Sequence, residues 1–259
     1  MCQLKSCLVL KDRVFCPDYD SHQQMLEELG IEDDYLHASK TFVRVEFTPP
    51  DDNTRSLIEP LNRWTLEVDQ DIVPEWWDEK ADRQRVEEAV EAWRKGHVFT
   101  GGKHIVTTGT VYTYSDAEVH AYNDTTVIAH DSTTVKAYSN AKVYAFGKTT
   151  VETVSNVPVE AYGDATVKAY GNAKVEAFDR TVVKAYSNVK VEAHDSTTVE
   201  AYNSVTVKAH SNAKVEAFDI AIVKAFDRTT VKAYNRAMVI YPEEKKIIYP
   251  TGWTAETHE

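Results

Sequence analysis

Six tyrosines recur along the chain at every sixteenth position, with some rungs occupied by other residues: Tyr122, Tyr138, Tyr170, Tyr186, Tyr202 and Tyr234. If their rings point outward from equivalent turns of a repeated structure, they form a flat aromatic stripe. Such a stripe is suited to stacking on sugar rings, on bases or on a partner protein. The alternative is a structural ladder, in which the rings stack on one another and shield a narrow core. The two roles are compatible, and these six residues are the candidate binding site.

Three histidines take the place of an aromatic residue in the intervening repeats: His130, His194 and His210. Imidazoles stacked one above another could hold a metal ion or respond to pH. The simpler interpretation is that histidine replaces tyrosine or phenylalanine in a second ladder. The sequence favours that interpretation, and we predict no metal site.

The sequence contains no motif that points to an enzyme. A P-loop, a GxGxxG fingerprint and an HExxH helix are all absent. Cys2, Cys7 and Cys16 lack the spacing of a zinc site, so we expect free thiols in a reducing compartment. We therefore predict no catalytic residue and no cofactor.

The strongest pattern in the chain is a repeat of eight residues. Valine occupies every eighth position from Val111 to Val239, in all 17 cases, and alanine follows two residues later in 14 of them. These small residues alternate with threonine, lysine and glutamate, which predicts short strands with one buried face. Turn-forming residues such as Ser139-Asn140 and Gly171-Asn172 separate the strands.

An unbroken repeat of this kind favours a solenoid over a series of hairpins. Grouping the octads in pairs separates a tyrosine-rich aromatic column from a mixed one, whereas grouping them in threes blurs the distinction. The predicted fold is mainly β: a parallel two-sheet β-solenoid of about eight 16-residue coils, preceded by a small α+β domain. Its valine and alanine interior requires the two sheets to lie close together.

The sequence divides into three parts. We assign residues 1–104 to an α+β N-terminal capping domain, 105–240 to the solenoid and 241–259 to a C-terminal cap. Caps are expected because a solenoid exposes a sheet edge at each end. In the N-terminal domain the predicted strands are Cys7–Leu10, Arg13–Phe15, Phe42–Phe47 and Trp64–Val68.

Two helices are predicted in the N-terminal domain. The first begins at the N-cap residue Ser21, with Gln24 completing a capping box, and stops at Gly30. The second and longer helix has Pro74 in its first turn and ends at Gly96.

The charge of the chain is unevenly distributed. The net charge is −12, and residues 1–104 carry 13 basic and 22 acidic residues, whereas residues 105–240 carry 14 and 15. An acidic chain is not expected to bind nucleic acid, and a nearly neutral rod is unsuited to mimicking it. No apolar run is long enough to span a membrane and the N-terminus lacks a secretory signal, so we expect a cytoplasmic protein with no membrane contact.

The octads, such as Ala165–Asn172, resemble the A-T-V-x-A-Y-[GD]-[SN] repeats of uncharacterised bacterial and phage β-solenoid proteins. The N-terminal domain is similar to one that precedes such repeats in gut-associated members. That second likeness lies in Pro17–His22, Met25–Ile31 and Val68–Asp71, with Pro74 and Trp76. The resemblance implies the solenoid architecture and supplies no catalytic residue.

The repeat favours a non-enzymatic binding or scaffold protein that presents a rigid, repetitive surface to a glycan or protein partner. The alternative is a phage or bacterial host-interaction or anti-defence factor that acts through the acidic N-terminal domain. Ice binding requires a regular threonine array, but charged residues such as Lys136 and Glu200 interrupt it. The partner and the oligomeric state are left open by the sequence.

Overall fold

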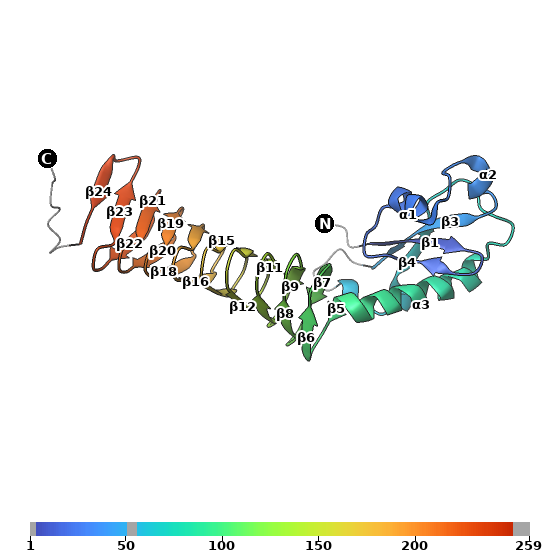
Figure 1. Cartoon of the computed structure of the whole chain (residues 1–259), viewed down its shortest axis with the longest axis horizontal. Coiled ribbons are helices and arrows are strands. Elements are labelled where there is room, and N and C mark those ends of the chain that lie inside the picture. The colour runs from blue at the N-terminus through green and yellow to red at the C-terminus, as the bar shows by residue number, and fades with distance from the viewer. Residues whose placement is uncertain (1–3, 51–55, 251–259) are drawn as a thin grey trace. The chain divides into compact units, whose positions relative to one another are not determined.

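The computed structural model describes residues 4–50 and 56–250 (Figure 1). The chain divides into two compact units, Met1–Val98 and Phe99–Glu259. The boundary predicted from the sequence lies after residue 104, six residues further along the chain.

The first unit contains a four-stranded antiparallel sheet with the order β2-β1-β3-β4. Its strands are β1 (Lys5–Leu10), β2 (Val14–Phe15), β3 (Phe42–Thr48) and β4 (Thr65–Val68). They lie where the sequence predicts them. Two short 3-10 turns, Ser56–Ile58 and Leu61–Arg63, precede β4.

Helix α1 (His22–Leu29) has the predicted ends. The Ser21 hydroxyl accepts a hydrogen bond from the backbone N–H of Gln24 at 3.3 Å. At the other end Gly30 adopts a φ of 65°, the left-handed conformation that glycine reaches without steric cost. The four-residue helix α2 (Tyr35–Ala38) was not predicted, because it is too short to show a helical period.

The prediction for the long helix α3 (Glu79–His97) is wrong at its start. The helix begins after Asp78, whose carboxylate accepts hydrogen bonds from the N–H groups of Lys80 and Ala81. Pro74 instead lies in a turn before the helix. The first N–H groups of a helix have no partner within the helix, and a side chain that accepts their hydrogen bonds fixes where the helix begins. Asp78 has such a side chain, whereas Pro74 does not.

The core of the first unit lies on both faces of β1, which is buried along its whole length. Leu8 and Leu10 pack with Met25, Leu26 and Phe42 on the face covered by α1. Helix α3 lies along the sheet and contacts β1 and β2 (Figure 1), and Val86 and Val90 are among its buried residues.

The second unit is a solenoid of two parallel sheets. One sheet has nine strands: β6 (Lys103–Val106), β8 (Glu118–Ala121), β10 (Thr134–Ala137), β12 (Thr150–Thr153), β14 (Thr166–Ala169), β16 (Val182–Ala185), β18 (Thr198–Ala201), β20 (Lys214–Ala217) and β22 (Thr230–Ala233). The other has eleven: β5 (Val98–Phe99), β7 (Thr110–Thr113), β9 (Thr126–Ala129), β11 (Lys142–Ala145), β13 (Pro158–Ala161), β15 (Lys174–Ala177), β17 (Lys190–Ala193), β19 (Thr206–Ala209), β21 (Ile222–Ala225), β23 (Met238–Tyr241) and β24 (Lys246–Ile248). We call them the nine-stranded and the eleven-stranded sheet.

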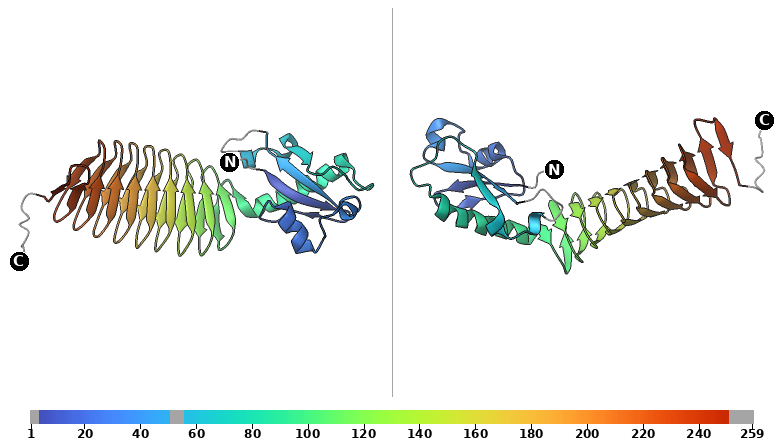
Figure 2. Two further views of the ribbon diagram at one scale, coloured as in Figure 1. Left: turned by 90° about the horizontal axis from the view of Figure 1, so that it is seen from above. Right: turned by 180° about the vertical axis from the view of Figure 1, so that it is seen from behind.

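Strand pairing confirms the predicted coil of two octads. Val135 pairs with Val151, and Val151 pairs with Val167, so valine stacks on valine from coil to coil. Figure 2 shows the strands of successive coils lying side by side along the solenoid. Within the described residues the strands make about nine coils rather than eight. The additional coil begins at β6, where His104 pairs with Val119. His104 thus occupies the position of the repeat that carries valine in the other octads, so the sequence pattern does not reveal this coil.

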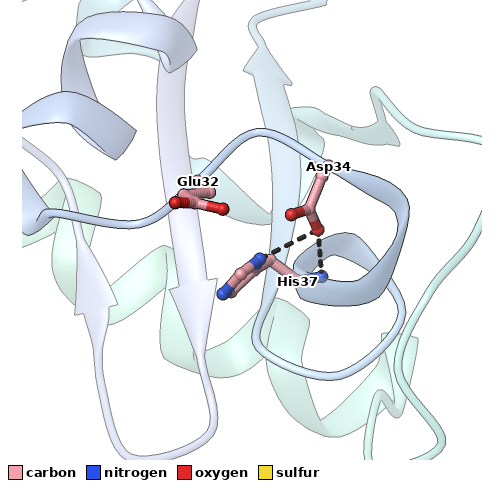
Figure 3. Close-up of side chains that lie close together, drawn as sticks. All are labelled: Glu32, Asp34 and His37. Atoms are coloured by element: carbon pink, nitrogen blue, oxygen red, sulfur yellow. Dashed lines mark hydrogen bonds and ion pairs between the residues drawn. The ribbon is translucent and has the colours of Figure 1, made fainter.

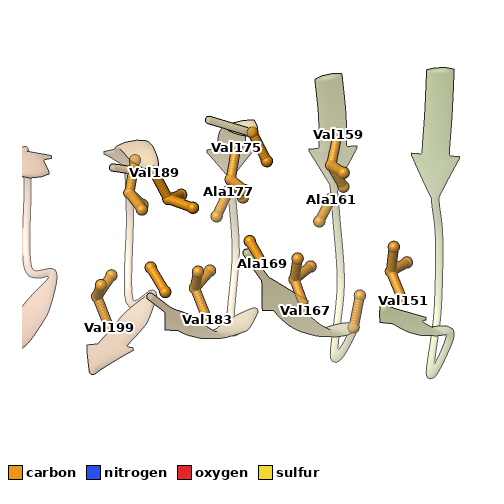
Figure 4. Close-up of a cluster of buried hydrophobic side chains, with 14 of the residues drawn as sticks. Val151, Val159, Ala161, Val167, Ala169, Val175, Ala177, Val183, Val189 and Val199 are labelled. Carbon is orange, nitrogen blue, oxygen red and sulfur yellow. The ribbon is translucent and has the colours of Figure 1, made fainter. Parts of the chain in front are cut away.

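The interior of the solenoid is as thin as the sequence predicts. Val167 and Ala169 of one sheet face Val175 and Ala177 of the other, and all four are at most 1% exposed (Figure 4). Such small side chains bring the sheets into close contact, and burial is achieved by stacking coils rather than by filling a deep core.

The turns repeat as regularly as the strands. The residue after each aromatic position adopts a positive φ, as in Asn123 (54°), Ser139 (60°) and Asp179 (56°). Asparagine, aspartate and glycine tolerate this conformation better than other residues. At Gly171 a Cβ atom would lie 3.0 Å from the backbone nitrogen of Ser155, so only glycine fits without displacement.

Turn side chains also join one coil to the next. A carboxylate oxygen of Asp179 accepts a hydrogen bond from the backbone N–H of Gly163 at 2.8 Å, and Asp131 does the same for Ser115 at 3.0 Å. The buried hydroxyl of Thr149 donates to the carbonyl of Phe146 at 2.7 Å. The polar turn residues therefore satisfy backbone groups that the strands leave unpaired.

At the C-terminal end β24 pairs antiparallel with β23 and covers the edge of the eleven-stranded sheet. This strand falls inside the predicted cap, 241–259. The remainder of that prediction, residues 251–259 with Trp253, lies outside the described residues.

Candidate functional site

The six candidate tyrosines lie in one column along the solenoid, together with Val154 and Phe218; we call it the tyrosine column. Neighbouring rings stack face to face: Tyr122 on Tyr138 at 4.8 Å, Tyr170 on Tyr186 at 4.9 Å and Tyr186 on Tyr202 at 5.0 Å between centroids, with ring planes within 12° of parallel. Phe218 continues the stack to Tyr234 at 4.8 Å. The structure therefore brings all six residues into one surface feature.

Stacking covers the ring faces of the tyrosine column and leaves edges and hydroxyls accessible. The Tyr202 hydroxyl donates to the Glu200 carboxylate at 3.0 Å, and desolvation, together with this carboxylate, raises the pKa of Tyr202. This geometry corresponds to the structural ladder. Val154, 41% exposed, interrupts the aromatic stack between Tyr138 and Tyr170. Ligand binding by the tyrosine column stays a prediction.

A second column of stacked rings lies at the opposite turn of each coil. It consists of Tyr114, His130, Phe146, Tyr162, Phe178, His194, His210 and Phe226, with centroids 4.6 to 5.2 Å apart. His194 and His210 stack at 5.1 Å with planes 7° apart, so histidine takes the place of an aromatic ring, as the sequence favoured. His130 is 5% exposed, and desolvation lowers its pKa.

The eleven-stranded sheet carries a surface groove that sequence reasoning missed. Its volume is about 560 Å³, and it is lined by Asn156, Asn172, Asn188, Pro158, Lys174 and Lys190. We call it the asparagine–lysine groove. The sequence identifies Asn172 only as a turn residue, and its alignment with Asn156, Asn188 and the outward lysines becomes visible once the register of the coils is known.

The register explains how the chain builds this groove. Pro158 pairs with Lys174, and Lys174 pairs with Lys190, at the first outward position of three successive strands. Among the described residues, neither lysine has a carboxylate within ion-pair distance. Elsewhere on this sheet Lys142 contacts Glu160 at 3.6 Å and Lys208 contacts Glu192 at 3.5 Å.

The groove therefore offers two uncompensated ammonium groups and three amides in a row. An amide both donates and accepts hydrogen bonds, and an ammonium group donates three. Among the described residues that line the groove, none carries a carboxylate, imidazole, hydroxyl or thiol side chain.

The first unit has a polar cavity of about 610 Å³ with an acidic lining. Asp33, Asp34, Asp69 and Asp71 contribute carboxylates to it, beside Arg44 and Gln70. Arg44 pairs with Asp33, and His22 contacts Asp69 at 3.2 Å. The cavity belongs to the domain that carries most of the chain's negative charge.

A cluster of three potential metal ligands lies in the first unit: Glu32, Asp34 and His37 (Figure 3). Each residue offers one ligating atom, and these three atoms lie within 4.8 Å of one another. Asp34 accepts hydrogen bonds from the backbone N–H of His37 and from its Nδ1, both at 2.8 Å. These bonds, the backbone one first, lower the pKa of Asp34. They are the bonds of a helix N-cap at α2, so we assign the cluster to capping.

No helix in the described ranges, 4–50 and 56–250, is both long and apolar enough to cross a bilayer.

Comparison of the chain with protein-family models, with curated proteins and with solved structures finds no match.

Proposed function

We propose that this chain is a non-enzymatic binding protein whose solenoid presents the asparagine–lysine groove to an extended glycan. The observation that carries the proposal is the row of three amides and two unpaired ammonium groups that line the groove. The predicted scaffold role is part of the same proposal, since the coils hold these groups in a fixed row.

The spacing of the groups supports an extended, repetitive ligand. Stacked rings of successive coils lie 4.6 to 5.2 Å apart between centroids, which gives the spacing of the coils. Asn156, Asn172 and Asn188 lie on successive coils and therefore recur at about that interval. Sugar rings in an extended glycan follow one another at a comparable interval, so successive hydroxyls can meet successive amides. Multiple contacts of this kind add affinity along the chain of the ligand.

The lining supports binding rather than catalysis. Hydrolysis of a glycan uses a pair of carboxyl groups on either side of the bond that is cleaved. The groove is lined by amides, ammonium groups and a proline.

A glycan array probed with the full chain tests the proposal. The double variant Lys174→Gln, Lys190→Gln should bind any retained glycan about tenfold or more weakly, because each lost charged hydrogen bond is worth roughly 1.5–3 kcal/mol. The matched control is Lys168→Gln, Lys224→Gln, which removes the same charge from exposed positions outside the groove.

The tyrosine column gives a second arm of the same experiment. Replacement of Tyr170, Tyr186 and Tyr202 by serine should leave groove binding unchanged if folding is intact. Loss of binding in the tyrosine variant alone would transfer the site to the tyrosine column. Equal loss in the lysine variant and its control would reject the groove.

The kinship with octapeptide-repeat β-solenoid proteins of bacteria and phages belongs to this proposal as well. It rests on the repeat sequence, as in Ala165–Asn172, and on the stretches of the N-terminal domain named above.

The acidic cavity favours a second candidate function, host interaction or anti-defence through the N-terminal domain. Four aspartates at one cavity suit a basic surface on a partner protein. Asp69→Asn with Asp71→Asn should weaken capture of such a partner from a host extract. Glu88→Gln with Glu91→Gln, both exposed on α3, is the charge-matched control, and equal capture by both variants would exclude the cavity.

A further inference from the structure

Two cysteines of the first unit are brought opposite each other by the β1–β2 hairpin, Cys7 within β1 and Cys16 directly after β2. In the antiparallel pair β1–β2, Leu8 is the partner of Phe15, so the next pair along the strands is Cys7 and Cys16. Both cysteines are free thiols. The sequence separates them by a turn, and the hairpin brings them together.

The hydrogen-bond pattern places the two cysteines in the closer type of cross-strand pair. The Leu10 N–H donates to the carbonyl of Arg13 at 2.8 Å, which marks that pair as hydrogen-bonded. Hydrogen-bonded and non-hydrogen-bonded pairs alternate along antiparallel strands, so Cys7 and Cys16 form a non-hydrogen-bonded pair. Their Cα atoms are then about 4.5 Å apart, within the roughly 4.4–6.8 Å that a disulfide spans.

The two thiols differ in exposure and in proton affinity. Cys7 is fully buried, whereas Cys16 is half-buried and reachable from solvent. The Cys7 thiol donates a hydrogen bond to the Cys16 sulfur, which raises the pKa of Cys7 and lowers that of Cys16. The resulting arrangement has an accessible thiol of lowered pKa beside a buried thiol of raised pKa.

A buried lysine adds positive charge beside this pair. Lys5, 1% exposed, precedes Cys7 by two residues on the same face of β1, and its charge lowers the pKa of Cys16. Its Nζ is held by Asp20 at 2.7 Å and lies 5.0 Å from the centre of the Trp93 ring. The carboxylate of Asp20 opposes the lysine, and the hydrogen bond from Cys7 is the larger effect on Cys16.

We propose that Cys7 and Cys16 form a reactive dithiol that exchanges with low-molecular-weight disulfides and closes into a cross-strand disulfide. The site lies in the first unit and is independent of the proposed glycan groove.

The exchange proceeds in two balanced steps. The Cys16 thiolate attacks one sulfur of a disulfide RSSR, forming a mixed disulfide and releasing RS⁻. Cys7 then loses its proton and attacks the Cys16 sulfur, which forms the internal bond and releases the second RS⁻. The two protein thiols are oxidised, and the small disulfide is reduced to two thiols.

The test uses the full chain with Cys2→Ser, so that the third cysteine does not contribute. After incubation with oxidised glutathione and acid quenching, intact mass should fall by two hydrogen atoms. Trypsin cuts after Lys11 and Arg13, between the two cysteines, and should yield one cross-linked peptide pair. A chain that keeps both thiols, or that ends only as the glutathione adduct, would overturn the proposal.

Two variants separate the roles of the thiols. Cys7→Ser should accumulate the glutathione adduct on Cys16 to a level about tenfold above that of the parent, because nothing resolves it. Cys16→Ser should stay unmodified, since Cys7 is buried. Circular dichroism checks folding, and if either variant fails to fold, the mass measurement on the Cys2→Ser chain decides alone.

Discussion

Tyr138 and Tyr170 lie two coils apart in the tyrosine column, and Val154 occupies the position between them. Every other position of this column from Tyr122 to Tyr234 carries an aromatic ring. The stack is therefore divided into a short segment and a long one. Each ring that borders Val154 has one face without an aromatic neighbour in the described part of the column. The irregular rung has consequences for stability that can be measured.

Replacing Val154 with tyrosine should stabilise the protein. The new ring gains Tyr138 and Tyr170 as stacking partners, and each stacked pair contributes about 0.5–1.5 kcal/mol beyond buried area. Urea denaturation should show a higher midpoint. Val154→Thr, which has the same shape and adds no ring, is the control. A midpoint for the tyrosine variant at or below that of the threonine control would show that stacking does not stabilise this column.

Asp179 combines a left-handed backbone conformation with a side-chain hydrogen bond to Gly163 of the preceding coil, and two substitutions separate the two contributions. Asp179→Gly keeps the φ of 56° but loses the hydrogen bond to Gly163, which should cost about 0.5–1.5 kcal/mol. Asp179→Ala loses the bond and must also adopt a left-handed conformation, which should cost about 1–2 kcal/mol more. The free energies of unfolding of the two variants provide the comparison. Equal values would mean that the turn relaxes to another conformation in the alanine variant.

His130 should make stability depend on pH. Burial lowers its pKa from the ordinary value of 6.5, so the unfolded chain takes up this proton at a higher pH than the folded one. The contribution of His130 is therefore complete above pH 6.5 and decreases as pH falls from 6.5 toward the folded value. His130→Phe retains a ring between Tyr114 and Phe146 but cannot take up a proton. When the free energy of unfolding is measured at about pH 8 and at about pH 5, this variant should lose less stability than the parent. The same loss in both proteins would assign the dependence to other groups.

The thin core should reject larger side chains. Ala169 is fully buried, and Ala169→Leu should destabilise the solenoid by about 1–3 kcal/mol or more, since the opposing sheet leaves no space for added carbon atoms. Thermal unfolding followed by circular dichroism measures the effect. Lys168→Leu, the same new side chain at the neighbouring exposed position, is the control and should change stability by less than about 0.5 kcal/mol. A tolerated leucine at residue 169 would indicate that the sheets can separate.

The solenoid was predictable because its signal is repeated many times. Each octad independently places valine inside and a turn residue after the aromatic position, and the contrast between the two aromatic columns selects coils of two octads over coils of three. The first coil was missed because His104 occupies the valine position. In the N-terminal domain, Ser21 and Gly30 correctly predicted the two ends of α1. Pro74 gave a wrong start for α3, because Asp78 is the residue that caps this helix.

The candidate surface sites were less predictable from the sequence than the fold. Alternation along a strand tells which side chains point outward, but it does not give the orientation of a tyrosine ring relative to its neighbour. The alignment of Asn156, Asn172 and Asn188 with Lys174 and Lys190 depends on which strands are adjacent. Likewise, Cys7 and Cys16 become neighbours only through the register of β1 and β2.

The pairing of octads within each coil also determines which changes in length the gene can tolerate. Removing or inserting two octads would shorten or lengthen the rod by one whole coil and leave every downstream residue on its original side. A single octad would move all downstream residues to the opposite side, which would split both aromatic columns and the row of asparagines. The identical octads Asn172–Asp179 and Asn212–Asp219 stand on opposite sheets, in β15 and β20, so the strand itself accepts either environment. Growth in pairs of octads would therefore change the length of the solenoid and leave both aromatic columns continuous.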